Sequence, residues 1–233
     1  MKIRLSAAIM IASISIAASA CTINLGSGDN ANARPASGNA NASNASTASN
    51  KAANPSTSAK PVIKGEAKPT DGKAKTANKS NPVPEDWIYV YDSAKGYGFS
   101  MPEGSEGESE AIDGIDVFAA ATPAPSEIDV FVLAYKDKTR TKEDLLNDAV
   151  EFLTALGQEV TPGDLKAEGG DYAVADATTV HPSRGKGKLR ILVGTDITDN
   201  YVMILGTEEG RFAANESIID AIWGSFEMWS GGN

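Results

Sequence analysis

Residues able to do acid–base or nucleophilic chemistry are few in this sequence. Its 233 residues include one histidine, His181, and one cysteine, Cys21. A general base needs a nucleophile or a carboxylate within hydrogen-bonding reach, and no pattern around His181 supplies one. The Gly-x-Ser-x-Gly, Gly-x-x-x-x-Gly-Lys and His-Glu-x-x-His motifs are absent from the sequence. We therefore expect a structural role for His181, which precedes Pro182 at the end of a predicted strand, and no enzymatic activity.

The single cysteine also limits the metal and redox chemistry of the chain. It excludes an intrachain disulfide and any zinc or iron–sulfur site built from several cysteines. We expect no cofactor and no bound metal.

An acidic run lies at residues 103–116. Hard cations such as calcium prefer carboxylate oxygens, so the run could hold a divalent cation. It lacks the Asp-x-Asp-x-Asp-Gly spacing of a calcium loop, and a solvated acidic loop is the simpler interpretation. Its carboxylates are Glu103, Glu106, Glu108, Glu110, Asp113 and Asp116.

One basic cluster contrasts with the acidic character of the chain, whose formal net charge is −10. This net charge argues against general nucleic-acid binding, which needs clustered positive charge. Alternation places three of the four cluster residues on one face of a predicted strand. Such a patch can steer a protein partner, or its cations can simply offset nearby carboxylates. The cluster, our candidate partner-binding surface, consists of Arg184, Lys186, Lys188 and Arg190.

Cys21 has a sequence context typical of secretion. The chain opens with Lys2 and Arg4, continues with an apolar stretch over residues 5–17, and reaches the small residues Ala18-Ser19-Ala20 just before the cysteine. A positive start, a short apolar stretch and small residues before a cleavage site form a secretory signal. We predict a signal peptide over residues 1–20. A plain signal cleavage that leaves Cys21 as a free thiol is the alternative.

The residues 18–21 resemble the lipobox of bacterial lipoproteins, with Ala18 in place of the common leucine. The resemblance implies that Cys21 carries diacylglycerol and becomes the acylated N-terminus of the mature protein. Two or more acyl chains are needed for stable anchoring to a bilayer. Thr22 replaces the aspartate that retains such proteins in the inner membrane of enteric bacteria. The expected location is therefore the cell envelope, on the periplasmic side of the outer membrane if the cell has one.

The next segment, residues 21–83, differs in composition from the rest of the chain. It is rich in Asn, Ala, Ser, Lys and Pro and has no aromatic residue, so it cannot form a core. We predict that it is a disordered tether with an excess of positive charge. All three tryptophans, six tyrosines and six phenylalanines come later, which predicts one folded domain over residues 84–230.

Side-chain periodicity predicts the elements of this domain. Branched and aromatic residues with intervening turns indicate strands at 87–91, 97–101, 115–120, 128–135, 172–180, 189–195 and 201–207. The strand at 128–135 is apolar on both faces, which is typical of the middle of a covered sheet. Helices are predicted from Thr141 to Gly157 and over residues 211–226, because apolar residues recur there at helical spacing. The order favours an α+β domain, an antiparallel sheet with helices packed on it.

This arrangement resembles the PsbP-like domain, named for an extrinsic subunit of photosystem II. The resemblance is carried by the Tyr97-Gly98-Phe99-Ser100-Met101-Pro102 motif of the opening hairpin and by the closing 218–226 helix with Ser225-Phe226. It implies a layered fold, and binding or assembly more often than catalysis. It transfers no functional residue to this chain.

Three functions remain open from the sequence. The first is a lipid-anchored, non-catalytic module that binds or assembles an envelope protein partner. The second is a lipoprotein that binds a ligand or divalent cation through residues 103–116. The third, an envelope hydrolase, would need a polar cluster in a deep pocket that the sequence cannot show.

Overall fold

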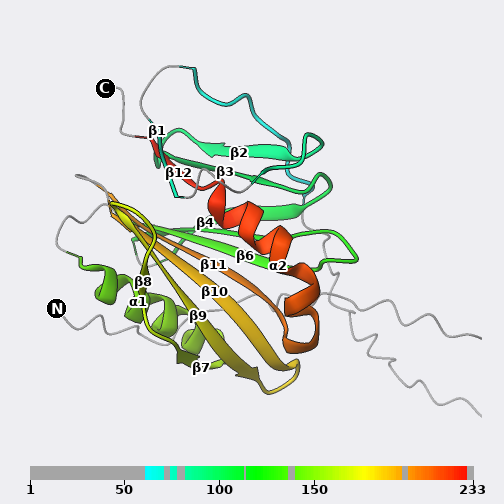
Figure 1. The fold of residues 1–233 in the computed structure, drawn as a ribbon, viewed down its shortest axis with the longest axis vertical. Helices are drawn as coiled ribbons and strands as arrows, with labels where there is room; N and C mark the ends of the chain where they lie inside the picture. The colour runs from blue at the N-terminus through cyan, green and yellow to red at the C-terminus, as the bar shows by residue number, and fades with distance from the viewer. Residues whose placement is uncertain are drawn as a thin grey trace, which may run out of the picture. The chain divides into compact units, whose positions relative to one another are not determined.

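The fold consists of two antiparallel sheets and two helices in layers (Figure 1). The computed structural model describes residues 61–70, 74–77, 82–112, 114–135, 140–195 and 199–229. The elements are β1 (Ala74–Thr76), β2 (Ile88–Asp92), β3 (Tyr97–Met101), β4 (Glu106–Ile112), β5 (Ile115–Ala121), β6 (Asp129–Tyr135), α1 (Lys142–Ala155), β7 (Glu159–Pro162), β8 (Lys166–Ala167), β9 (Tyr172–His181), β10 (Gly185–Thr195), β11 (Asn200–Glu208), α2 (Glu209–Gly224) and β12 (Glu227–Trp229). The predicted signal peptide, Cys21 and the tether up to residue 60 lie outside the described residues.

The larger sheet has the strand order β4-β5-β6-β11-β10-β9-β7, with β8 also pairing with β9. β9, β10 and β11 form a meander, since β10 pairs antiparallel with both of its neighbours in the chain. β6 lies between β5 and β11, as its apolar faces predicted. The smaller sheet has the order β1-β12-β3-β2 and contains the predicted hairpin of β2 and β3.

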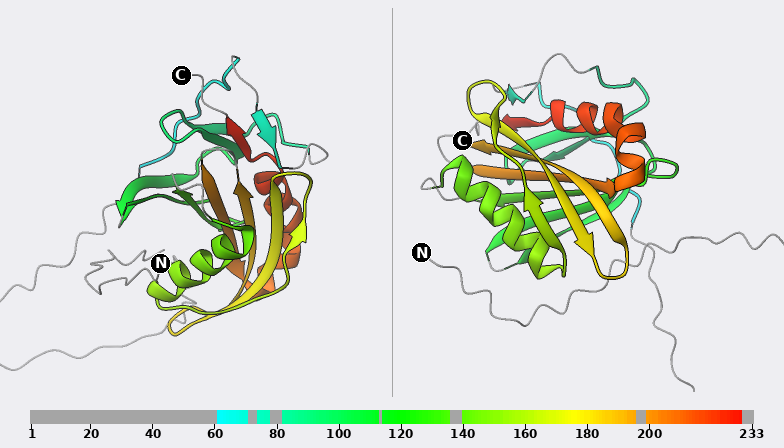
Figure 2. Two further views of the ribbon diagram at one scale, coloured as in Figure 1. Left: turned by 90° about the vertical axis from the view of Figure 1, so that its left-hand side faces the viewer. Right: turned by 60° about the horizontal axis from the view of Figure 1, so that its bottom comes forward.

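Both faces of the larger sheet are covered (Figures 1 and 2). On one face, the ring of Phe131 in β6 lies 5.4 Å from that of Phe152 in α1. Ala175 of β9 is on this same face, because its row runs through Ile191 and Ile204 to Phe131. The small side chains on this face of β9 therefore leave room for α1. The opposite face packs against α2 and the smaller sheet.

The main core is aromatic at its centre. Phe226, which follows α2, is 1% exposed and its ring lies 5.8–6.3 Å from four other rings. These rings are Tyr97, Phe99, Tyr172 and Tyr201. The Tyr97–Met101 motif and Ser225-Phe226 thus meet in one place. Burial raises the pKa values of Tyr97 and Tyr172 above the ordinary tyrosine range, so both hydroxyls stay protonated.

Helix α1 begins with a capping box formed by Thr141 and Asp144. The Thr141 hydroxyl accepts a hydrogen bond from the Asp144 N–H at 3.1 Å, and the Asp144 carboxylate accepts one from the Thr141 N–H at 2.9 Å. These bonds satisfy N–H groups that a helix start leaves without a partner. At the other end, Gly157 has a φ of 83°, the left-handed conformation that glycine adopts without strain.

We expect Thr141→Ala to destabilise the protein by about 1 kcal/mol, because it removes this cap. Hydrogen bonds from Thr141 lower the pKa of the Asp144 carboxyl group. A lowered pKa adds stability that is present above the ordinary aspartate pKa and is lost as the pH falls through the lowered value. Thr141→Ala keeps the backbone N–H that lowers this pKa most, so the acid dependence is tested with Asp144→Asn, which has no carboxyl group at this position. Urea unfolding between pH 2 and pH 6 should show a weaker acid dependence in Asp144→Asn than in the parent protein. Equal acid dependence in both proteins would contradict this role for the capping box.

The predicted boundary between tether and domain at residue 83 is wrong. Residues 61–70 and 74–77, here called the N-terminal strap, pack against the fold. Strand β1 pairs with β12, and the Glu66 N–H donates to the Tyr89 carbonyl at 2.8 Å. The strap is held largely by main-chain hydrogen bonds along strand edges, and such contacts require no apolar periodicity. For this reason its composition gave no signal of folded structure.

The acidic run is also not the loop that we predicted. Residues Glu106–Ile112 form β4, which pairs with β5 along its whole length. β4 is a terminal strand of the larger sheet within the described residues, and most of its side chains are exposed. An exposed edge strand lacks the apolar alternation by which strands are recognised, and charged side chains are typical of such edges.

Candidate functional site

The four residues of the candidate basic surface do not form one exposed patch. Lys186, Lys188 and Arg190 do share one face of β10, as predicted, with Leu189 and Ile191 on the other. Lys186 is exposed and Lys188 is half-buried, near the β9–β10 turn. Whether these two lysines bind a partner stays a prediction.

Arg190 lies beneath α2, and its side chain is only 12% exposed. Its Nε donates to Asp176 Oδ1 at 2.9 Å, and its guanidinium also pairs with Asp220 and Glu216 of α2. Burial opposes the charge, but these three carboxylates outweigh it and raise the pKa of Arg190 further. The guanidinium carbon lies 5.6 Å from the Phe212 ring centre. Arg190 therefore ties α2 to the sheet.

Arg184 also has an acidic neighbour. Its guanidinium lies 3.3 Å from Asp129 of β6, and both side chains are partly exposed. For Arg184 and Arg190, the geometry agrees with the alternative that cations of this hairpin offset nearby carboxylates.

His181 ends β9, and its Nδ1 lies 3.0 Å from the Ser183 hydroxyl. This contact lies within the turn between β9 and β10.

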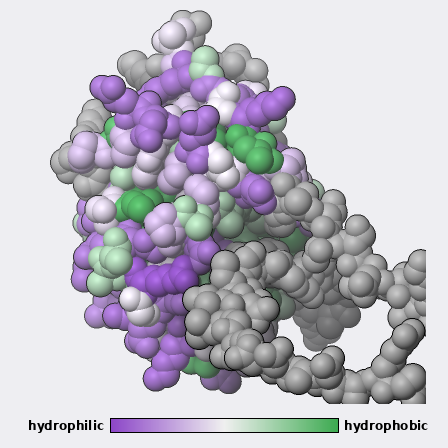
Figure 3. Space-filling view, turned by 90° about the vertical axis from the view of Figure 1, so that its right-hand side faces the viewer, coloured by the Kyte–Doolittle hydropathy of each residue, from purple (hydrophilic) through white to green (hydrophobic). Residues whose placement is uncertain are grey.

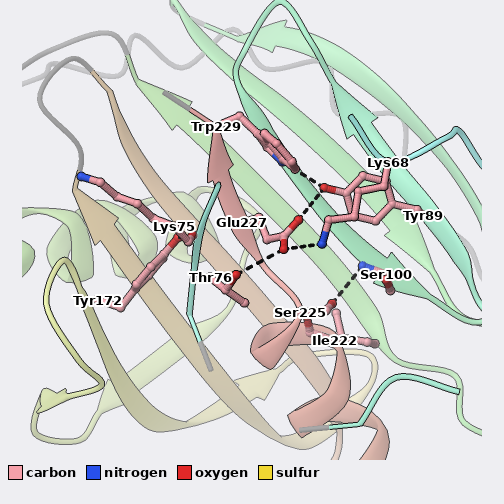
Figure 4. A network of polar contacts seen from close by, with 10 residues as sticks. All are labelled: Lys68, Lys75, Thr76, Tyr89, Ser100, Tyr172, Ile222, Ser225, Glu227 and Trp229. Atoms are coloured by element: carbon pink, nitrogen blue, oxygen red, sulfur yellow. Dashed lines mark hydrogen bonds and ion pairs between the residues drawn. The ribbon is translucent and has the colours of Figure 1, made fainter. Parts of the chain in front are cut away.

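The most buried charged group in the described residues lies elsewhere, in the smaller sheet (Figure 4). Glu227 of β12 is 5% exposed. Its Oε1 accepts hydrogen bonds from Lys68 Nζ at 2.5 Å and from Thr76 Oγ1 at 3.2 Å. Its Oε2 accepts one from the Tyr89 hydroxyl at 2.9 Å. Two of the three donors, Lys68 and Thr76, belong to the N-terminal strap.

The Tyr89 hydroxyl extends the Glu227 network. It accepts a hydrogen bond from Trp229 Nε1 at 3.0 Å while donating to Glu227. Burial raises the pKa of Tyr89, and the nearby Glu227 carboxylate raises it further, so the hydroxyl remains a donor. Gly98 of β3 is required beneath it, because a Cβ there would lie 2.2 Å from the Tyr89 hydroxyl oxygen.

Only one weak signal of this network is visible in the sequence. Glu227 stands in the apolar run Phe226-Glu227-Met228-Trp229, and a charged residue there indicates a buried partner. Lys68 is one of several lysines in a segment that appeared disordered by composition. The network holds the strap against the smaller sheet, because Lys68 and Thr76 of the strap both bond to Glu227. A separate hydrogen bond, from the Tyr172 hydroxyl of the larger sheet to the Lys75 carbonyl at 2.6 Å, adds to this attachment.

A small hollow lies elsewhere in the described residues. It has a volume of about 160 Å³ and lies between the β2–β3 turn and β4–β5, lined by Lys95, Tyr97, Ser109, Ala111 and Asp116 among others.

No group of three or more potential metal-ligating side chains occurs in the part of the chain that the structure describes. Neither helix of that part has the length and apolar composition to cross a membrane. Figure 3 shows one face on which hydrophilic residues predominate and hydrophobic ones form small separate spots.

Comparisons with known proteins assign the fold and nothing further. The structure is similar to the solution structure of cyanobacterial PsbP (CyanoP) from Synechocystis sp. PCC 6803, with a TM-score of 0.51 and 16% sequence identity, over 63% of this chain and 95% of that one. A crystal structure from Bacteroides thetaiotaomicron VPI-5482 matches with a TM-score of 0.42 and 10% identity, over 62% of this chain and 49% of that one. No family model and no curated protein matches the sequence. The chain therefore has a PsbP-like fold dominated by antiparallel sheet.

Proposed function

We propose that the protein is a lipoprotein of the bacterial cell envelope, whose folded part is a non-catalytic binding or assembly module. The observation that carries the proposal is the position of the only cysteine, Cys21, directly after Ala18-Ser19-Ala20 and a short apolar stretch. Acyl chains on Cys21 would hold the protein at a membrane. Thr22 favours the outer membrane over the inner one.

The buried charged groups of the folded part make their contacts within the fold. The buried Glu227 accepts three hydrogen bonds within the fold, and Arg190 is engaged by three carboxylates. Both groups fasten segments of the fold to each other. The support for a binding or assembly role is the PsbP-like fold, because the resemblance implies binding or assembly more often than catalysis.

We expect Cys21→Ser to release the protein from membranes, because serine has no thiol to form the thioether with diacylglycerol. The measurement is fractionation of cells that express the full chain, with mass spectrometry of the N-terminal peptide from the membrane fraction. The parent protein should carry diacylglycerol and an amide-linked acyl chain on Cys21. Ser19→Ala, which keeps the residue before Ala20 small, is the matched control and should leave anchoring unchanged.

Two results would refute the anchor. One is a mature N-terminal peptide with an unmodified thiol at Cys21. The other is a membrane-bound protein that still carries residues 1–20 in both the parent and the Cys21→Ser variant. Either result would leave the fold assignment untouched.

A further inference from the structure

The ammonium group of Lys68 reaches a buried carboxylate from the surface of the molecule. The Lys68 side chain is 55% exposed, whereas that of Glu227, whose Oε1 lies 2.5 Å from Lys68 Nζ, is only 6% exposed. Nζ also lies 5.7 Å from the ring centre of Tyr89, close enough for a cation–π contact. Figure 4 shows Lys68, Thr76 and Tyr89 converging on the Glu227 carboxylate. The carboxylate and the ring thus hold an ammonium group that enters from the solvent side.

The other hydrogen bonds of Glu227 restrict which cation fits. Its Oε2 accepts from the Tyr89 hydroxyl at 2.9 Å, and its Oε1 accepts from Thr76 Oγ1 at 3.2 Å. An ammonium group is a compact donor and needs only the remaining position on Oε1. A guanidinium binds a carboxylate best through two parallel bonds, so it would have to compete with Tyr89 for Oε2. The geometry therefore favours lysine-type over arginine-type cations.

The strap has other attachments besides the Lys68 side chain. The Glu66 N–H donates to the Tyr89 carbonyl at 2.8 Å, and the Ala77 N–H donates to the Phe226 carbonyl at 2.9 Å. Between these two points β1 pairs with β12. The Lys68 ammonium group can therefore leave Glu227 while the main chain of the strap stays paired.

We propose that Glu227, Thr76 and Tyr89 form a binding site for a primary ammonium group, in which Lys68 is a replaceable occupant and a lysine side chain of a partner protein is the ligand. Without the partner, Lys68 neutralises a carboxylate whose buried charge would otherwise be unpaired. Lysine is favoured over an aminophospholipid headgroup, because the phosphate of such a headgroup would lie close to the Glu227 carboxylate. The inference rests on the proposed binding function and names the chemical group that the partner supplies. It does not depend on the acyl anchor at Cys21.

The test uses the full chain labelled with nitrogen-15 and follows its tryptophan indole N–H resonances by NMR. The Trp229 indole donates to the Tyr89 hydroxyl at 3.0 Å and therefore reports on the site. The Trp223 indole donates to Asp220 at 3.0 Å and is the internal control. A Trp229→Phe variant identifies the reporting resonance. The probe is Nα-acetyl-lysine N-methylamide, which carries the lysine side chain without a charged main chain.

We expect the probe to shift the Trp229 resonance and to leave that of Trp223 in place. In Lys68→Ala the midpoint of this shift should come at a concentration about tenfold or more lower than in the parent, because Lys68 competes from within the same chain at a high effective concentration. The matched control Lys64→Ala removes another exposed lysine of the strap and should behave like the parent. Adding Glu227→Gln to Lys68→Ala should abolish the shift. Lys68→Ser is the second variant, used if Lys68→Ala shifts the urea-unfolding midpoint.

Two further probes define the chemistry of the ligand. The arginine analogue of the amide should need a concentration about tenfold or more higher than the lysine amide to shift Trp229. Glycerophosphoethanolamine should also bind more weakly than the lysine amide, and tighter binding would instead identify a lipid headgroup as the source of the amine.

Several results would overturn the proposal. These are no shift of Trp229 in Lys68→Ala or Lys68→Ser, equal midpoints in these variants and the parent, equal binding of the lysine and arginine amides, or tighter binding of glycerophosphoethanolamine. A parent protein that shows no shift at a hundred times the midpoint of the variant would make Lys68 a fixed part of the fold, which also contradicts exchange. None of these outcomes bears on acylation of Cys21, which the fractionation experiment tests separately.

Discussion

Phe226→Ala is expected to destabilise the protein by about 3–5 kcal/mol, the usual cost of removing a buried phenylalanine ring. The ring is 1% exposed and lies at the centre of four other aromatic rings from both sheets. Truncation would therefore leave a cavity where the two sheets and the end of α2 meet. Rigid aromatic neighbours can close such a cavity only in part.

The measurement is urea unfolding of the full chain, followed by tryptophan fluorescence. Phe212→Ala is the matched control, because Phe212 is the same residue type but is only partly buried at the edge of the same core. Its ring faces the Arg190 guanidinium, and its loss should cost much less than that of Phe226. If both variants lose equal stability, Phe226 is not the centre of the core.

The elements that the sequence predicted are those with a side-chain pattern. β2, β3, β5, β6, β9, β10 and β11 have branched or aromatic residues facing a core, and both helices have apolar stripes. The pairing of β2 with β3 and of β10 with β9 and β11 follows from short connections, whereas β6 pairs with β11, which is distant in the chain. Even the faces of β10 were predictable, since Lys186, Lys188 and Arg190 lie on one side.

The elements that the sequence did not predict lack a readable side-chain pattern. β12 has buried side chains, but its three residues are too few to show an alternation. β4 and β1 are held mainly through their backbones, since β4 has exposed glutamates and β1 lies in a lysine-rich segment. Main-chain hydrogen bonds do not depend on side-chain type, so composition could not distinguish the N-terminal strap from a disordered tether. The same limit applied to Arg190, whose face was predictable while its cover by α2 was not.

The Glu227 network could not be predicted, because its contacts join residues that are distant in the chain. The partners of Glu227 are separated from it by 138 to 159 positions in the chain. No spacing rule joins residues at such separations without a known register. The acidic character of β4 was visible as charge, but its pairing with β5 was not.

Glu227→Ala is expected to cost about 3–5 kcal/mol, because removal of one member of a buried charged network leaves its partners unsatisfied. The donors left behind are the Tyr89 hydroxyl, the Thr76 hydroxyl and the Lys68 ammonium group. Lys68 is more than half exposed and can regain water, so most of the cost should fall on Tyr89 and Thr76. Glu227→Gln keeps an acceptor oxygen and should cost less. Glu103→Gln, an exposed site, should have no measurable effect.

A measurement at individual amides shows whether Glu227 holds the strap in place or stabilises the whole domain. Hydrogen exchange of the Glu227→Gln variant should become faster at the amides of Glu66 and Ala77, which bond to the rest of the fold at 2.8 and 2.9 Å. Amides in the centre of β6 and β11 should stay protected, since Glu227 does not contact them. Uniformly faster exchange would mean that Glu227 stabilises the whole domain. Unchanged exchange at Glu66 and Ala77 would mean that backbone pairing alone holds the strap, because its main-chain bonds would then be sufficient without the buried carboxylate.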